Sequence, residues 1–290
     1  MKPYSIGLYE KAMPNSLTWR EKLKCAKECE YDFVEISIDE TDEKLARLDW
    51  RETEIQRLIE DMNELEISIR SMCLSGHRKY PFGSCHPATR SRSIEIMGKA
   101  IDLADKLGIR LIQLAGYDVY YEESTPESKA LFIENLRQAA MMAARNGVLL
   151  GFETMETEFM NTVSKSMFYV SCIGSPYLGI YPDVGNLTNA AVSYGTSVID
   201  DLETGKGHIM AVHLKETVPG KFREIPFLTG HVDFEGIIEK AWNLGVRRYV
   251  TEMWDVGAES WKQDIQFANR SMRRILDRRA ETPSSCQEEG

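Results

Sequence analysis

The sequence predicts one α/β domain folded as a (β/α)8 TIM barrel. Short apolar segments alternate along the chain with segments whose apolar residues recur at helical spacing. No linker-like stretch interrupts this alternation, and 290 residues is an ordinary length for one such barrel. A doubly wound open sheet is the competing architecture, but no Gly-x-Gly-x-x-Gly motif follows the first strand. We expect the barrel to span residues 1–279 and residues 280–290 to form a disordered tail.

The expected strands are short apolar runs bounded by glycine, proline or polar residues, as in a parallel sheet buried on both faces. Glu35 lies inside the second of these runs, between Val34 and Ile36. The fifth, at the centre of the chain, runs directly into carboxylates. In chain order the expected strands are 5–9, 31–38, 67–74, 110–115, 148–156, 177–183, 209–215 and 248–254.

Helix boundaries are marked by capping signals. Thr18 and Glu21 are placed as a capping box, and Thr125 precedes a proline at the first helical position. Gly108 and Gly147 come where a left-handed glycine would end a helix. The remaining helices follow from apolar periodicity. The expected helices lie near 18–26, 51–65, 94–107, 125–146, 164–173, 196–203, 234–244 and 261–275.

Composition excludes several function classes. The formal net charge of -10 and the pI of about 5.2 argue against a nucleic-acid partner and give no attraction to anionic membranes. No apolar run approaches the roughly 20 residues that span a bilayer, and the N-terminus has no signal-peptide pattern. The six cysteines are scattered and form no Cys-x-x-Cys motif. We therefore expect a cytoplasmic protein with free thiols.

A candidate metal site follows from the strand ends. In a parallel barrel the carboxyl ends of all strands face one mouth, so polar residues there converge. Three carboxylates and one imidazole suit one divalent ion such as Mn²⁺, Zn²⁺, Mg²⁺ or Co²⁺. A lone acid at a strand end is more often a helix cap or an ion-pair partner, but three acids and one histidine at the ends of four successive strands favour a metal. These residues are Glu153, Asp183, His213 and Glu252.

The residues around these ligands resemble a known family. The motifs FETM, YPDVGN, VHLKET and TEMW are similar to those of the xylose-isomerase-like sugar isomerases and epimerases. Segments 8–12, 71–75 and 113–121 narrow the resemblance to the L-ribulose-5-phosphate 3-epimerases, also described as L-xylulose-5-phosphate 3-epimerases, of pentose and ascorbate catabolism. The match covers nearly the whole chain except its tail.

The resemblance implies a reaction and residue roles. Glu153 and Glu252 would be both metal ligands and the two catalytic acid/base groups. They would epimerise a ketopentose phosphate at C3 by removing and returning a proton through an enediolate. Glu156, or alternatively Glu158, would contact the substrate, and Asn186 would contact sugar hydroxyls.

Three other functions remain open at this stage. An aldose–ketose isomerase acting on a hexulose phosphate could use the same metal site. An endonuclease of abasic DNA is disfavoured by the five histidines and the acidic charge, because that class needs a multi-zinc cluster and a basic face. A sugar-binding or purely structural barrel would use the metal for stability alone.

A phosphate site is the remaining expectation. Basic residues follow the third and seventh strands, and phosphate sites of barrels often lie in the later loops. Solvated loop charges would explain the same pattern. We expect His77 and Lys215 to contact the phosphate because they lie closest to their strand ends. Outer-helix Trp and Met residues are compatible with a homodimer, although the sequence does not place the contact.

Overall fold

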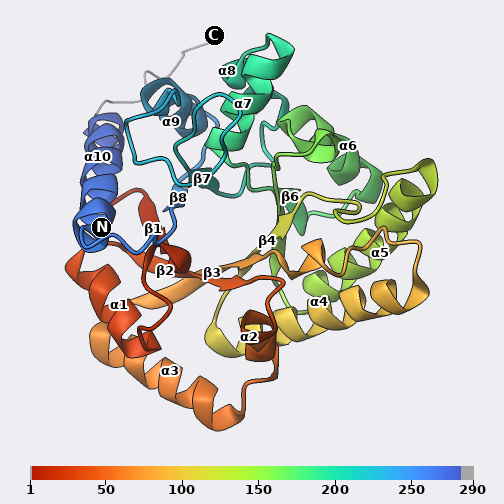
Figure 1. Ribbon diagram of the computed structural model, residues 1–290, viewed down its shortest axis with the longest axis horizontal. Coiled ribbons are helices and arrows are strands. Elements are labelled where there is room, and N and C mark those ends of the chain that lie inside the picture. Colours follow the sequence, from red (N-terminus) through yellow and green to blue (C-terminus); the bar gives the residue numbers. More distant parts are fainter. Residues whose placement is uncertain (1, 282–290) are drawn as a thin grey trace, which may run out of the picture.

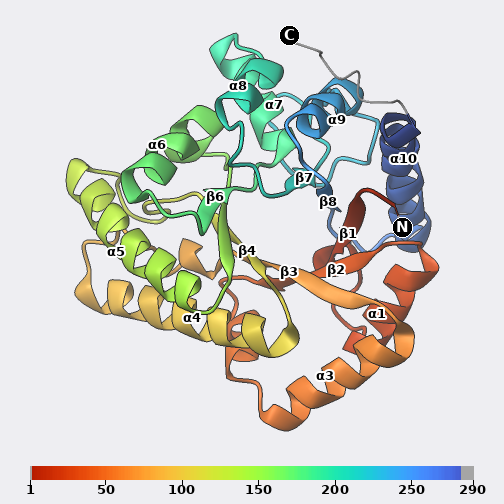
Figure 2. The same cartoon turned by 180° about the vertical axis from the view of Figure 1, so that it is seen from behind.

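The computed structural model describes residues 2–281 and confirms the predicted barrel. Its strands lie at the centre and pair only in parallel, and the helices form a ring around them (Figure 1). The same ring is seen from behind in Figure 2. The strands are β1 (Ser5–Tyr9), β2 (Phe33–Ile38), β3 (Ser68–Leu74), β4 (Leu111–Ala115), β5 (Leu149–Glu153), β6 (Leu178–Ile180), β7 (Val212–Leu214) and β8 (Arg248–Thr251).

The barrel closes between β6 and β7. The hydrogen-bonded order runs from β6 through β1 to β8 and β7, so these two strands are the ends of the sheet. Parallel bridges join Ile180 to Ile209 and Asp183 to His213 across the gap. The N–H of His213 donates to the carbonyl of Pro182 at 2.9 Å. Two of the expected metal ligands therefore face each other where the barrel closes.

The helices follow the predicted order. The Thr18–Glu21 capping box is present, and Gly108 and Gly147 have positive φ at helix ends. None of the helices within residues 2–281 is both long and apolar enough to span a membrane. The helices are α1 (Trp19–Glu28), α2 (Asp42–Leu45), α3 (Glu52–Leu65), α4 (Pro87–Leu107), α5 (Pro126–Arg145), α6 (Val163–Ile173), α7 (Val184–Tyr194), α8 (Val198–Thr204), α9 (Phe234–Asn243) and α10 (Trp261–Glu281), with 3-10 turns η1 (Glu10–Ala12), η2 (Ala46–Asp49), η3 (Gly76–Arg78) and η4 (Glu158–Met160).

Several features differ from the sequence prediction: α2 was not expected, α4 begins at Pro87 rather than near residue 94, and two further differences concern β6 and the C-terminus. The strand expected over 177–183 ends at Ile180, because the chain then enters α7, a helix that weak apolar periodicity did not reveal. At the C-terminus, α10 continues to Glu281, so residues 280 and 281 are helical and do not belong to a tail. The rest of the predicted tail, 282–290, lies outside the described residues.

The interior of the barrel is packed with side chains, so it is not a pore. One buried cluster takes a residue from each of seven strand segments. On β1, Gly7 leaves room for the ring of Phe33, because a Cβ at Gly7 would lie 2.3 Å from that ring. The cluster consists of Tyr9, Phe33, Cys73, Leu111, Tyr181, Ala211 and Val250.

A buried ion cluster fixes the turn after β1. Glu10 is fully buried, and its carboxylate lies 2.6 Å from Lys44 Nζ, 2.6 Å from Arg47 Nη1 and 3.5 Å from Lys22 Nζ. It also accepts the backbone N–H of Ser37 at 2.9 Å. Burial acts to raise the pKa of Glu10, but the charges of Arg47 and Lys22 outweigh it and lower this pKa to about 2.

We expect Glu10→Gln to destabilise the fold by about 3 kcal/mol or more, because three cations would then be buried with no anion among them. Urea unfolding at pH 7 measures this loss. The folded pKa of Glu10 is lowered from 4.5 to about 2, so the wild-type advantage should be full above pH 4.5 and vanish as the pH falls toward 2. The exposed Glu43→Gln variant is the control. Equal stability of the two variants at pH 7 would contradict this role.

Candidate metal centre and active site

The four predicted metal ligands meet at one end of the barrel. Glu153 is the last residue of β5, Asp183 caps α7, His213 lies on β7, and Glu252 directly follows β8. One ligand atom from each lies within 4.8 Å of the others. All four are buried, and the most exposed, Glu252, shows 6% of its surface. The arrangement offers three carboxylates and one imidazole to a single ion.

His213 is held between two carboxylates. Its Nδ1 lies 2.9 Å from Glu252 Oε2, and its Nε2 lies 2.5 Å from Glu35 Oε1. Burial opposes a charge on the imidazole, but Glu35 and Glu252 outweigh it and raise the pKa of His213 well above its usual range. If the ring donates its Nε2–H to Glu35, Nδ1 remains the atom available to a metal.

Glu35 is fully buried and is fixed by further hydrogen bonds. Its Oε2 accepts the hydroxyl of Ser71 at 2.7 Å and that of Tyr181 at 2.8 Å. The sequence placed Glu35 inside a strand but gave it no role. An acid within an otherwise apolar strand run was the signal that could have identified it, since such a group must find donors.

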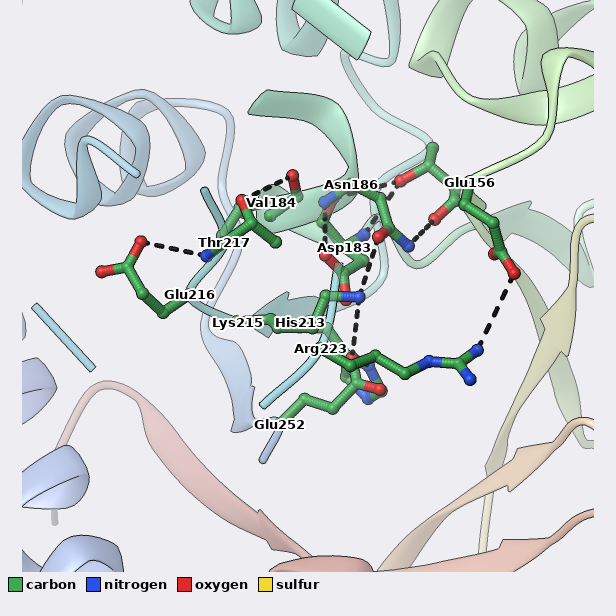
Figure 3. A network of polar contacts seen from close by, with 12 residues as sticks. Glu156, Asp183, Val184, Asn186, His213, Lys215, Glu216, Thr217, Arg223 and Glu252 are labelled. Atoms are coloured by element: carbon green, nitrogen blue, oxygen red, sulfur yellow. Dashed lines mark hydrogen bonds and ion pairs between the residues drawn. The ribbon is translucent and has the colours of Figure 1, made fainter. Parts of the chain in front are cut away.

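Asp183 joins the metal cluster to the neighbouring helix. Its Oδ1 accepts the N–H of Asn186 at 2.8 Å, which caps α7. Its Oδ2 lies 2.8 Å from Lys215 Nζ as an ion pair, yet it accepts no well-oriented hydrogen bond within residues 2–281. Lys215 Nζ instead donates to Asn186 Oδ1 at 2.8 Å (Figure 3). Lys215 is therefore fixed deep in the site as a counter-ion.

The cluster contains more carboxyl groups than its neighbouring basic groups can neutralise. Burial, with the charge of Glu252, raises the pKa of Glu153 to about 7. Burial also raises the pKa of Asp183 well above its usual range, although Lys215 opposes this. For Glu252, burial is outweighed by Lys215 and His213, which hold its pKa well below its usual range. An under-paired Asp183 oxygen and two carboxyls that resist ionisation fit a site built to receive a cation.

The cluster opens into a cleft that contains both Glu153 and Glu252. Asn186 and Lys215 line the cleft, as does Glu156, one of the predicted substrate contacts. The remaining lining residues come from the loops that follow β1, β3, β5, β7 and β8, together with two strand residues. They are Tyr9, Lys11, Cys73, Ser75, Arg78, Met155, Phe222, Arg223 and Trp254.

Glu156 lies among aromatic and cationic groups at the mouth. Its carboxylate accepts the hydroxyl of Tyr117 at 2.6 Å. It also lies 3.8 Å from the Arg223 guanidinium (Figure 3). The alternative substrate contact, Glu158, is exposed in η4 and does not line the cleft. Glu156 is therefore the better placed of the two acids.

His77 does not lie in the cleft, contrary to our expectation. Its ring is buried 4.3 Å from that of Phe82, and its Nε2 lies 3.1 Å from the carbonyl of Ser93 on α4. Burial lowers the pKa of His77 to about 4, so the ring is neutral at pH 7. The 3-10 turn η3 points successive side chains in different directions, and Arg78 lines the cleft in its place.

Comparisons with known proteins agree with the barrel fold. A family model described as xylose isomerase-like TIM barrel matches residues 23–271. The putative L-ribulose-5-phosphate 3-epimerase SgbU of Escherichia coli (strain K12) is 45% identical over 277 residues, which cover 93% of this chain and 96% of that protein. The L-ribulose-5-phosphate 3-epimerase UlaE of Escherichia coli (strain SE11) is 44% identical over 268 residues, covering 92% and 93%.

Solved structures share the fold. An L-ribulose 3-epimerase superposes with a TM-score of 0.78 and 18% sequence identity, covering 98% of this chain and 99% of that chain. D-psicose 3-epimerase, solved in the presence of D-fructose, has a TM-score of 0.77 and 15% identity, covering 94% and 99%. At these identities the likeness concerns the fold alone.

We expect Glu35→Gln to weaken Mn²⁺ binding roughly 10- to 100-fold, because the imidazole of His213 would lose the carboxylate that orients it. A calorimetric titration of the chelator-treated protein measures the dissociation constant, and thermal unfolding of the metal-free variant checks its fold. The exposed Glu43→Gln variant should bind Mn²⁺ as the wild type does. Unchanged affinity in a folded Glu35→Gln variant would exclude this positioning role.

Proposed function

The chain belongs to the xylose isomerase-like TIM barrel family, and from this premise we propose that it is a metal-dependent L-ribulose-5-phosphate 3-epimerase. The observation that carries the proposal is that Glu153 and Glu252 both belong to the four-residue cluster and both line the cleft. Relatives that match over nine-tenths of the chain are named as enzymes of this activity. Their names favour C3 epimerisation over the aldose–ketose isomerase alternative.

The reaction needs a proton removed from C3 and another returned on the opposite face of the sugar. We assign these two tasks to Glu153 and Glu252, with the direction of reaction deciding which acts as base. A divalent ion, when bound, supplies Lewis-acid stabilisation of the negative charge that develops beside the carbonyl. In the metal-free chain Glu252 is held ionised whereas the pKa of Glu153 is about 7. Such a pair can hold a carboxylate and a carboxylic acid at once, which is what the two tasks require.

Neighbouring residues orient the reacting groups. Lys215 holds Asp183 in place, and Asn186 donates its amide N–H to the carbonyl of Thr154 at 2.7 Å. Because both polar atoms of the Asn186 amide are engaged, its proposed contact with a sugar hydroxyl would add to its role in fixing Lys215. Glu156 lies at the mouth, where its carboxylate can accept a hydrogen bond from a substrate hydroxyl.

We assign the enzyme to pentose and ascorbate catabolism in the cytoplasm. The substrate class comes from the names of the relatives. The cysteines described within residues 2–281 are free, including exposed Cys85 and Cys172, as a reducing compartment requires. A homodimer remains a proposal from the sequence alone.

We expect Glu153→Gln and Glu252→Gln each to lower turnover of L-ribulose 5-phosphate about 100- to 10,000-fold, because each removes one acid/base group. NMR in D₂O should show deuterium entering only at C3 in the wild type, with L-xylulose 5-phosphate as the product. Metal content is measured for each variant. If both variants retain metal and near-normal turnover, the assignment is wrong.

The same assay tests the metal. Chelation should abolish C3 exchange, and Mn²⁺, Co²⁺, Zn²⁺ or Mg²⁺ should restore it. Undiminished exchange in fully chelated protein would contradict the metal dependence. Deuterium at C1 with an aldose as the product would identify the isomerase alternative.

A further inference from the structure

The cations that line the cleft come from two sides of the mouth. Lys215 and Arg223 follow β7, whereas Lys11 lies in η1 after β1 and Arg78 lies in η3 after β3. The phosphate of a sugar phosphate is a dianion that binds to such cations. A cation whose N–H groups are not all hydrogen-bonded can bind it without losing an existing contact, so the partners of each cation indicate which side binds the phosphate.

Arg78 has a buried donor without a partner. Its guanidinium lies 4.9 Å from the ring centre of Tyr120 and 5.7 Å from that of Tyr117. Its side chain is 16% exposed, and its Nη1 forms an ion pair with Glu40 at 3.8 Å, a distance too long for a hydrogen bond. The Nε–H is buried and makes no hydrogen bond to any part of the chain that the structure describes. A guanidinium that lies against two aromatic rings and has a free N–H suits the fork geometry of a phosphate.

Lys11 and Ser75 complete the same side of the mouth. Ser75 directly follows β3 and is 9% exposed, and its hydroxyl can donate to an anion. The side chain of Lys11 pairs with Asp39. The backbone carbonyl of Lys11 accepts the N–H of Asp255 at 2.7 Å, which fixes the backbone at Lys11. A phosphate at this point would meet two cations and a hydroxyl from two loops.

Of the cations on the opposite side, Lys215 is the most closely paired. Lys215 contacts Asp183 and Asn186 at 2.8 Å each, next to the metal ligands. Arg223 pairs with Glu156, and its side chain is 46% exposed. Binding a phosphate at Lys215 would break its close contacts, whereas at Arg78 it would give the unpaired Nε–H a partner. Arg78 and Arg223 each have one acid at 3.8 Å, but only Arg78 also has a buried donor without a hydrogen bond.

We propose that Arg78, together with Lys11 and Ser75, binds the phosphate of the substrate and confers selectivity for phosphorylated ketopentoses. Arg78 supplies two N–H donors from its fork, Ser75 supplies its hydroxyl, and Lys11 supplies a point charge. This inference rests on the proposed function and names the residues that recognise one part of its substrate. It replaces His77 and Lys215 as the phosphate contacts.

The test compares kcat/KM for L-ribulose 5-phosphate with that for unphosphorylated L-ribulose. Arg78→Gln should lower the first value roughly 10- to 100-fold and leave the second within about twofold, because only the phosphate loses a charged hydrogen bond. For Arg78→Lys, kcat/KM for L-ribulose 5-phosphate should lie between the values of the wild type and of Arg78→Gln, because lysine keeps the charge but not the two-pronged guanidinium. Turnover of the free sugar shows in the same assay that each variant is folded.

Two matched variants make the test specific. Lys79→Gln removes a neighbouring cation outside the cleft, one that pairs with Asp42 at 3.5 Å, and should change neither value. Arg223→Gln should change both values by a similar factor.

The outcomes separate the two proposals. If the wild type epimerises L-ribulose 5-phosphate but Arg78→Gln keeps its preference for that substrate, the phosphate assignment is overturned and the function stands. A loss of preference in Arg223→Gln alone would move the phosphate to the other side of the mouth and overturn it equally. If the wild type epimerises neither sugar, the proposed function itself has failed.

Discussion

The structure depends on how it balances the acids buried at one end of the barrel. Glu35, Glu153, Asp183 and Glu252 lie together with a single lysine and a single histidine among the contacts of the described residues. Burying unpaired carboxylates is costly, so they must either take up protons or bind a cation. With His213 neutral, as a metal ligand must be, the four carboxylates exceed Lys215 by three negative charges, and a divalent ion would offset two of them. The fit for a metal ion and the pair of acids in the cleft are therefore two consequences of one arrangement.

The backbone imposes that arrangement. Parallel strands direct their carboxyl ends to the same mouth, and the barrel closes through the bridge between Asp183 and His213. Asp183 also caps α7, so the bend that ends β6 and the position of a ligand have the same cause. A substitution at Asp183 would consequently disturb the helix start, the barrel seam and the ion site together. The position of the site therefore depends on the contacts that close the barrel.

Much of this could be predicted from the sequence, and the failures have physical causes. Strand and helix order followed from periodicity, and the meeting of Glu153, Asp183, His213 and Glu252 followed from strand ends, because both depend on local pattern and on the geometry of parallel sheets. Helix α7 was missed because its periodicity is weak and its start depends on a cap that doubles as a ligand. Glu35 and Arg78 were not assigned because their roles depend on partners distant in sequence, namely His213 and Tyr120. His77 was misplaced because sequence distance from a strand end does not fix the direction of a side chain in a 3-10 turn.

The most direct test of the account is a crystal structure of the full chain grown with Mn²⁺, with the ion located by its anomalous scattering. The account predicts one ion per chain, bound by one atom each of Glu153, Asp183, His213 and Glu252, with Glu35 still contacting His213 Nε2. An ion at another position, or the four side chains turned apart with no ion between them at saturating Mn²⁺, would contradict it.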